Sequence, residues 1–436
     1  MKILLIFPKV KNRHPDLRRE KDLFTKIFGE VVSLTLPQVA ASTPHGHVVT
    51  IVDENYETVN LEEDADLVGI TCLTMAAPRA YELADYFRAR GVTVVLGGNH
   101  PTALPQEAKQ HADSVIIGEA ETTWPRLLQD FAEGRLHPFY QVTERIAPEA
   151  IPEPRRDLIR RHYISDGLLI KRGCPNSCEF CTVTSLFSND IRSLDSVLTE
   201  VSHIRSKTIF IYDQNLTTYM AYTTKLLREL KKFEKRWLAN GTVDVLGKDD
   251  GFLHLAKDAG IFYWFIGFES ISQQSLDQTK KGRNRVELYP DIIQKIKDHG
   301  MVIVGSFMFG FDEDSPDVFQ RTLQKLDEWK IDMAEFHIVT PFPGTALYTR
   351  LKNEGRILTE NWSLYNTANV VFSPKKMTTE NLFEGTRTIA KEYYRYRRIA
   401  KRSFHALENS KNFFTASSVF FQNIKYRFRY KSQFNF

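Results

Sequence analysis

Short apolar runs separated by polar, helix-like stretches make up the first third of the chain. The runs occupy residues 2–7, 48–52, 67–71, 93–96 and 114–117. Short runs that stay apolar throughout are typical of strands buried on both faces. Residues 78–91 carry apolar side chains at helical spacing and end at Gly91, which favours an amphipathic helix with a left-handed stop. Strands alternating with helices predict a doubly wound parallel sheet over residues 1–136.

This pattern is interrupted over residues 137–165 and then resumes. The interruption contains prolines at positions 138, 148, 152 and 154, which predict a linker without regular structure. Beyond it, predicted strands occupy residues 167–171, 208–212, 242–246, 262–268, 301–307 and 335–339. Helical patterns fall between them, at residues 193–204, 222–238, 287–300 and 315–329. We therefore expect a second α/β unit over residues 166–360.

The C-terminal region, residues 361–436, differs in composition from the rest of the chain. A helix is predicted from Thr378 to about Ala406. From Lys391 to Phe436 the chain has eleven Lys or Arg, two Glu and thirteen aromatic residues. This mixture suits a segment lying on an anionic membrane surface, or a lid over a pocket for a large apolar substrate. Residues 425–430 also alternate like an edge strand. Single-stranded nucleic acid binds such mixtures too, but no RNA-binding motif accompanies this one.

Size and composition limit the class of protein. With 436 residues and 42% hydrophobic content, the chain can bury a large core in two or three domains. A net charge of +4 is too small to indicate nucleic acid by itself. The apolar N-terminus stops at Pro8, and no run of eighteen apolar residues occurs, so neither a signal peptide nor a membrane span is expected. We expect a cytoplasmic protein, to which the C-terminal region adds the option of membrane association.

Three of the four cysteines lie within eight positions, at Cys174, Cys178 and Cys181. Thiolates are the soft, charged ligands that iron–sulfur clusters need. A cubane held entirely by protein takes four cysteines, so three would leave one iron open to a small molecule. A structural zinc ion is coordinated by four protein side chains. Neither a fourth cysteine nor a histidine at zinc-finger spacing lies near these three cysteines. Cys72 lies in an apolar run and is expected to be a buried, inert thiol.

The spacing of three residues and then two, with Phe180 just before the last cysteine, resembles the signature of the radical S-adenosylmethionine (SAM) enzymes. In that family, the open iron of a [4Fe–4S] cluster chelates SAM, and the reduced cluster cleaves it to a 5′-deoxyadenosyl radical. The resemblance implies a partial (β/α)6 barrel over residues 166–360 with a helical C-terminal extension. It also implies an electron donor such as flavodoxin or ferredoxin, and a contact between Phe180 and SAM.

Functional residues of such a barrel lie just past the strand ends. Asp213 and Asn215 follow one predicted strand, where the family has an acidic and amide pair near the methionine part of SAM. The alternative for this pair is a turn with a side-chain cap.

Glu269 and Ser270 end a strongly apolar run, where an unpaired carboxylate would be costly. The resemblance implies that they contact the ribose or amino group of SAM. Arg283 belongs to the basic run 280–283, and the resemblance implies that it meets the SAM carboxylate. A solvated basic loop is the alternative for Arg283.

Two later stretches also follow predicted strands. Gly305 and Gly310 permit close approach of the backbone, and Asp312 is expected to face the cavity. Residues 340–348 read TPFPGTALY and are similar to a stretch of the cobalamin-linked subfamily, where a stiff loop would position SAM or substrate. His337 reads as a core histidine rather than a catalyst, and no catalytic residue is assigned.

The first unit resembles the cobalamin-binding domain that precedes the radical SAM domain in one large subfamily. The matching stretches are residues 69–74, 94–108 and 112–124. The resemblance implies cobalamin contacts just past two strands, at Thr71, Leu73, Thr74, Gly97 and Gly98, where adjacent glycines let a ligand approach the backbone.

The DxHxxG motif of many cobalamin domains is absent. His14 lacks the aspartate two positions before it and reads as a solvated loop residue. Cobalamin is therefore expected to bind without a protein histidine, and a domain that has lost cobalamin is the alternative.

The leading hypothesis is a cobalamin-dependent radical SAM methylase that acts on an unactivated carbon of a small or apolar substrate. Cyclisation, rearrangement or coupling without methyl transfer is the second hypothesis. A cobalamin-binding sensor with a structural cluster is the third. Methylthiolation would need three further cysteines for a second cluster, and only Cys72 remains. Lipid, isoprenoid, tetrapyrrole and natural-product substrates stay open, and the aromatic C-terminal region favours an apolar one.

Overall fold

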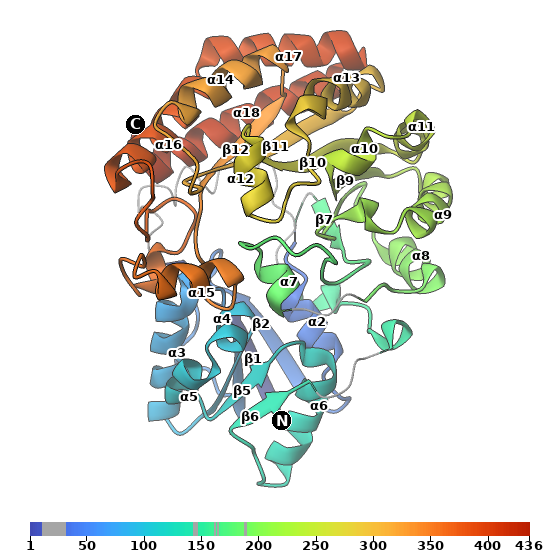
Figure 1. Ribbon diagram of the computed structural model, residues 1–436. Helices are drawn as coiled ribbons and strands as arrows, with labels where there is room; N and C mark the ends of the chain where they lie inside the picture. The colour runs from blue at the N-terminus through green and yellow to red at the C-terminus, as the bar shows by residue number, and fades with distance from the viewer. Residues whose placement is uncertain (11–31, 143–146, 161–162, 164, 187–189) are drawn as a thin grey trace.

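The computed structural model of the protein describes residues 1–10, 32–142, 147–160, 163, 165–186 and 190–436. Within these residues, the strands form two six-stranded parallel sheets that follow one another along the chain (Figure 1). His14, assigned to a solvated loop above, lies outside the described residues. None of the described helices has both the length and the apolarity that crossing a bilayer requires.

The first sheet has the strand order β2-β1-β3-β4-β5-β6. Its strands are β1 (Lys2–Phe7), β2 (Val48–Asp53), β3 (Leu67–Thr71), β4 (Thr93–Gly97), β5 (Ser114–Ile117) and β6 (Phe139–Gln141). Its helices are α2 (Thr35–Ala41), α3 (Ala77–Ala89), α4 (Asn99–Ala103), α5 (Pro105–His111) and α6 (Ala120–Ala132). Helices α3 and α5 pack on one face and α2 and α6 on the other, which confirms the doubly wound fold. The order reverses at β1, so the switch point of the sheet, where doubly wound folds bind ligands, lies at the carboxyl ends of β1 and β3.

All five runs predicted in this unit form strands, because each is apolar enough to be covered on both faces. The predicted helix over residues 78–91 is α3, and Gly91 follows it with a φ of 78°. The sixth strand, β6, pairs with β5 and lies inside the stretch expected to be a linker. Because β6 has only three residues, its apolar run is too short to predict a strand from the sequence alone.

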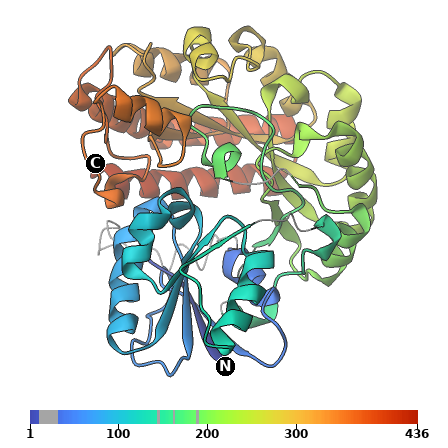
Figure 2. The same cartoon turned by 60° about the horizontal axis from the view of Figure 1, so that its bottom comes forward.

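The second sheet has the strands in chain order, from β7 to β12. They are β7 (Ser165–Leu168), β8 (Thr208–Ile211), β9 (Arg236–Gly241), β10 (Ile261–Glu269), β11 (Val302–Phe309) and β12 (Met333–Ile338). The helices between and after them are α7 (Thr182–Leu186), α8 (Leu194–His203), α9 (Met220–Leu230), α10 (Val243–Leu246), α11 (Asp250–Asp258), α12 (Gln273–Gln278), α13 (Tyr289–Asp298), α14 (Val318–Glu328) and α15 (Ala346–Asn353). Among the described strands, β7 and β12 end the sheet and do not pair with each other, so the curved sheet in Figure 2 is a partial barrel.

One predicted strand of this unit is wrong. Residues 242–246 were expected to be extended, but Val243–Leu246 forms the short helix α10. The strand is instead β9, which includes the last residues of the helix predicted over 222–238. Trp237 and Ala239 are fully buried on alternate positions of β9, and β9 pairs with β8 and β10 on its two sides. These long-range contacts override the β-branched composition of the following residues.

The C-terminal region is helical. It contains α16 (Thr379–Tyr393), α17 (Tyr396–Ser410) and α18 (Phe413–Phe434). The predicted helix over 378–406 is therefore two helices, separated at Tyr394 and Arg395. The alternating residues 425–430 lie within α18 and form no edge strand.

Two tyrosine hydroxyls of this region, one between α16 and α17 and one in α18, pair with the edge of β12 that no other described strand covers. The Tyr394 hydroxyl accepts from the Ala334 N–H at 3.2 Å and donates to the Ala334 carbonyl at 2.6 Å. The Tyr430 hydroxyl accepts from the Phe336 N–H at 2.7 Å and donates to the Phe336 carbonyl at 3.4 Å. Each hydroxyl thus satisfies the backbone groups that a neighbouring strand would satisfy.

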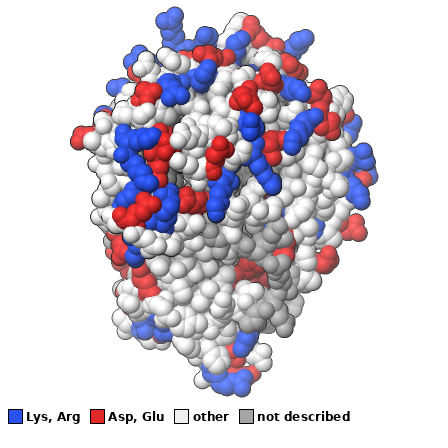
Figure 3. Space-filling model, in the orientation of Figure 1, with Lys and Arg blue, Asp and Glu red and all other residues white. Residues whose placement is uncertain are grey.

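The first part of α18 crosses the inner face of the partial barrel. Val419 packs with Tyr263 and Val302, which point away from the outer helices. The Tyr263 hydroxyl also lies 2.9 Å from the Ser418 hydroxyl. Over the helices of the second sheet, Lys and Arg are interleaved with Asp and Glu (Figure 3).

Candidate functional site

The loop that carries the three cysteines begins directly after β7 and is anchored by Asp213. The buried Asp213 carboxylate accepts hydrogen bonds from the N–H groups of Ile170 and Lys171, at 2.8 and 2.9 Å. Burial raises the pKa of Asp213 to about 6, although these two N–H groups oppose the shift. Asn215 accepts from the Thr217 N–H at 3.0 Å, so the capped turn considered as an alternative is formed. A contact of Asp213 with SAM stays a prediction.

The three cysteines of this loop differ in exposure. Cys178 is 9% exposed, whereas Cys174 and Cys181 are partly exposed. Burial raises the pKa of the Cys178 thiol to about 11, and the positive charge of Lys281 opposes this shift. An iron ion bound to the sulfur would stabilise the thiolate against the same desolvation. Among the described side chains, no three Cys, His, Asp or Glu converge on one point as ligands of a single ion do.

Glu269 is held in an unusual backbone conformation beside this loop. It ends β10 with a φ of 64°, in the left-handed region that is costly for a residue with a side chain. Its carboxylate pairs with Lys281 at 2.8 Å. Lys281 also acts electrostatically on the thiols of Cys178 and Cys181. Backbone strain together with a buried ion pair is typical of functional positions, and a role for Glu269 stays a prediction.

The basic residue that reaches Glu269 is therefore Lys281, two positions before the predicted Arg283. Arg283 is exposed to solvent. Ser270 is buried, and its hydroxyl accepts from the Ser272 N–H at 3.0 Å. Within the run 280–283, the side chain of Lys281 turns inward, and the sequence does not show which of these side chains does so.

Phe180, between the last two cysteines, lies 6.2 Å from Phe311 between ring centroids. It packs against the main core of the second unit. The roles predicted toward SAM for Phe180, Glu269, Ser270 and Arg283 stay predictions.

The predicted cobalamin contacts gather at the carboxyl ends of β3 and β4. Gly98 has a φ of 99°, and a Cβ atom there would lie 2.9 Å from both the Cys72 nitrogen and the Thr71 hydroxyl. Only glycine allows so close a contact between the two strand ends. Thr74 is buried, whereas Leu73 is 38% exposed. An exposed apolar side chain beside a closely packed backbone fits a flat macrocycle, and the individual contacts stay predictions.

The carboxyl edges of the two sheets meet at the cysteine loop. The nearly buried Arg172 guanidinium pairs with Glu121 and, at 3.3 Å, with Glu119, at the start of α6 in the first unit. Helix α7, which follows the last cysteine, contacts α4, which follows Gly98. The stretches predicted to hold the cluster and the cobalamin are therefore neighbours in space.

The loop 340–348 packs against α7, α4 and the cysteine loop at this junction. A Cβ atom on Gly344 would lie 3.0 Å from Leu186 of α7 and 3.1 Å from Ala103 of α4, and its φ is 83°. The Leu347 N–H donates to the Glu179 carbonyl at 3.0 Å. The loop thus contacts the cysteine loop and the first unit at once.

His337 lies on the inner face of β12 and is partly exposed. One ring nitrogen lies 3.1 Å from Glu335 and the other 3.1 Å from the Thr367 hydroxyl. Glu335 also accepts from Tyr426 at 2.9 Å and Arg429 at 3.0 Å. Burial acts to raise the pKa of Glu335, but Arg429, His337 and Tyr426 hold it well below its usual range. His337 thus belongs to a paired polar cluster rather than to the apolar core.

A cysteine loop on a partial parallel barrel, facing a doubly wound unit, defines a radical SAM enzyme with a cobalamin-binding domain. Residues 168–326 match the radical SAM superfamily, and residues 20–128 match the B12 binding domain. Residues 345–429 match a domain of unknown function (DUF4070).

The chain belongs to the family of B12-dependent radical SAM methyltransferases. It is 32% identical to bacteriochlorophyllide d C-12(1)-methyltransferase of Chlorobaculum tepidum, over 85% of this chain and 84% of the relative. It is 22% identical to hopanoid C-2 methylase of Rhodopseudomonas palustris, over 82% and 71%. Its fold is similar to that of the cobalamin-dependent SAM radical enzyme OxsB, with a TM-score of 0.69 and 15% identity, over 99% and 72% of the chains.

Family membership decides between the alternatives that the sequence left open. The protein is an enzyme rather than a sensor, and its cofactors are a [4Fe–4S] cluster, SAM and cobalamin. A zinc site and a domain that has lost cobalamin are thereby disfavoured. Binding of cobalamin without a protein histidine stays a prediction.

Proposed function

We propose that the enzyme methylates an unactivated carbon of an apolar ring system, with a tetrapyrrole or a polycyclic isoprenoid as the substrate class. The observation that carries the proposal is the junction at Arg172, where the cysteine loop is paired with the first unit. A radical source and a methyl donor must face the same substrate carbon, and this junction brings their two edges together. The names of the two relatives above, a bacteriochlorophyllide and a hopanoid enzyme, support the substrate class.

When bound, the cluster and SAM supply the radical that removes a hydrogen atom, and cobalamin supplies the methyl group. The chain's own residues orient these groups and exclude water. Arg172 links the two units through Glu119 and Glu121, and Gly98 lets the ends of β3 and β4 pack closely together. Inner-face side chains such as Phe265 and Met308 are partly exposed and offer apolar contact to a substrate. A one-electron carrier such as flavodoxin or ferredoxin is proposed as the reductant.

The proposal is tested with SAM whose methyl group carries deuterium. Protein reconstituted anaerobically with iron, sulfide and cobalamin is supplied with a reductant and with bacteriochlorophyllide d or a hopanoid as probe. We expect 5′-deoxyadenosine and a product that has gained one trideuteromethyl group, seen by mass spectrometry. A product that has only lost hydrogen would favour cyclisation or coupling. Formation of 5′-deoxyadenosine with no change in either probe would contradict the substrate class.

We further propose that the cytoplasmic enzyme makes peripheral contact with an anionic membrane surface. The hairpin of α17 and α18 exposes a group of apolar side chains: Phe404, Leu407, Phe413, Phe414, Phe420 and Phe421. Phe413 is 78% exposed. Exposed Lys401 and Lys411 flank this group, and Arg236 lies 4.2 Å from the Phe414 ring. Aromatic side chains next to cations suit the interface of anionic lipids.

The membrane contact is tested by sedimentation with vesicles. We expect the protein to bind phosphatidylcholine vesicles that contain phosphatidylserine, and Phe413→Ser with Phe414→Ser to lose most of this binding. Leu358→Ser is the control, because Leu358 is similarly exposed but lies away from the hairpin. Equal sedimentation of the double variant and the unmodified protein would rule out this surface.

A further inference from the structure

Glu179 lies between two of the cluster cysteines, Cys178 and Cys181, and is held at both its backbone and its side chain. Its N–H donates to the Thr279 carbonyl at 3.1 Å, and its carbonyl accepts from the Leu347 N–H at 3.0 Å. Its carboxylate receives two bonds from Arg350, at 2.6 Å from Nε and 3.2 Å from Nη2. The segment that joins the two cysteines is thereby tied to α12 and α15.

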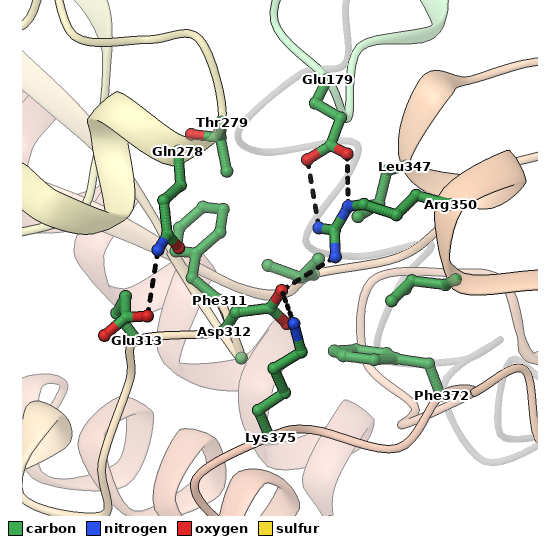
Figure 4. Close-up of a pocket in the computed structure, with 13 residues that line it drawn as sticks. Glu179, Gln278, Thr279, Phe311, Asp312, Glu313, Leu347, Arg350, Phe372 and Lys375 are labelled. Carbon is green, nitrogen blue, oxygen red and sulfur yellow. Dashed lines mark hydrogen bonds and ion pairs between the residues drawn. The ribbon is translucent and has the colours of Figure 1, made fainter. Parts of the chain in front are cut away.

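A second row of charges fixes Arg350 itself. Its Nη1 donates to Asp312 at 2.8 Å, and Arg356 and Lys375 bind the same carboxylate at 2.8 and 3.2 Å. Figure 4 shows Arg350 lying between Glu179 and Asp312 across a pocket of about 270 Å³. Asp312 lines this pocket and binds three cations, and its predicted place at the barrel cavity stays a prediction.

The ion pairs in this network are partly shielded from water. The side chains of Glu179 and Asp312 are 12% and 13% exposed, and that of Arg350 is 33% exposed. A bidentate guanidinium–carboxylate pair in such a setting is stronger and more directional than an exposed ion pair. Arg350 holds Glu179 in one orientation, and with it the path of the backbone from Cys178 to Cys181.

We propose that helix α15, which lies at the start of the stretch matching a domain of unknown function (residues 345–429), presets the cysteine loop, with Arg350 as the positioning residue for the cluster. A loop that is ordered before the cluster binds does not lose its conformational freedom in the binding step. Helix α15 therefore acts on the radical-generating site through Glu179. The Leu347 N–H and the Arg350 side chain act on the same residue, Glu179.

The test measures the cluster rather than the methylation. Full-length Arg350→Gln and Glu179→Gln are reconstituted anaerobically with iron and sulfide and then exposed to an iron chelator. We expect both variants to lose iron several-fold faster than the unmodified protein. We also expect the electron paramagnetic resonance spectrum of the reduced cluster to be broader, because the loop samples several geometries. Arg350→Lys keeps the positive charge but not the bidentate contact with Glu179. We therefore expect this variant to lose iron more slowly than Arg350→Gln but faster than the unmodified protein.

Lys352→Gln is the matched control. Lys352 lies on the same helix two positions later and pairs with the exposed Glu360 at 3.1 Å. It should leave iron retention and the spectrum unchanged. Unfolding of each cluster-free variant is followed in parallel, because a general loss of stability would lower the unfolding midpoint. Equal iron retention and identical spectra in Arg350→Gln and the unmodified protein would overturn the proposal, and this outcome is independent of the substrate.

Discussion

Replacing Cys178 with alanine is expected to abolish cluster binding and, with it, all detectable cleavage of SAM. We expect the protein to supply three thiolates for four irons, so that the loss of one would leave two irons without a protein ligand. Cys178 is also the most buried of the three, so water replaces its thiolate poorly. The measurements are iron per chain after anaerobic reconstitution, the visible absorbance of the cluster, and 5′-deoxyadenosine formed with a chemical reductant.

The control for this variant is Cys72→Ala. Cys72 is fully buried between β3 and α3, and its thiol donates weakly to the Leu73 carbonyl at 3.4 Å. Burial raises its pKa well above the usual thiol value, and Cys72 belongs to the core of the first unit rather than to the cysteine loop. We expect Cys72→Ala to bind as much iron as the unmodified protein. Cluster formation in Cys178→Ala, or its loss in Cys72→Ala, would contradict the assignment of the ligands.

Replacing Tyr394 with phenylalanine is expected to lower the free energy of unfolding by about 2–6 kcal/mol. The change removes one hydroxyl and leaves the N–H and the carbonyl of Ala334 without their partner. Each buried polar group that loses its hydrogen bond costs about 1–3 kcal/mol. Ala334 is fully buried, so water does not readily replace the hydroxyl. The measurement is urea unfolding of the cluster-free protein, followed by circular dichroism.

Tyr396→Phe is the control for the loss of a hydroxyl. Tyr396 is exposed at the start of α17, and its ring, which the change keeps, lies 4.3 Å from Arg427. We expect a change below about 0.5 kcal/mol, as for most surface substitutions. If Tyr394→Phe were as stable as Tyr396→Phe, the hydroxyl would not be needed at the edge of β12.

The architecture could be predicted from the sequence because burial on both faces leaves a strong signal. The strands of the first unit are short, apolar and separated by turns, and nearly all of them lie where expected. The wrong strand predicted at residues 242–246 arose because the true strand, β9, has only a weak apolar signal. Arg236–Gly241 contains a charge, an amide and a glycine and reads poorly as a strand, yet its pairing with β8 and β10 makes it one.

The cysteine loop could be located from spacing alone, but its supports could not. Arg350 lies 171 residues after Glu179, and no local pattern connects the two. The choice between Lys281 and Arg283 depends on how the backbone turns after Lys280, which has a φ of 59°. The break after Tyr393 likewise depends on contacts with β12, because the local sequence is compatible with a continuous helix.

The tyrosines that close β12 also have a consequence for synthesis of the chain. Tyr394 and Tyr430 follow their strand partners by 60 and 94 residues, so β12 leaves the ribosome well before the side chains that cover its edge. Until then, the strand presents unpaired N–H and carbonyl groups, which recruit strands from other chains. We therefore expect the C-terminal helices to protect the completed barrel from pairing with strands of other chains, and a ribosome that stalls between β12 and α16 to leave an aggregation-prone chain.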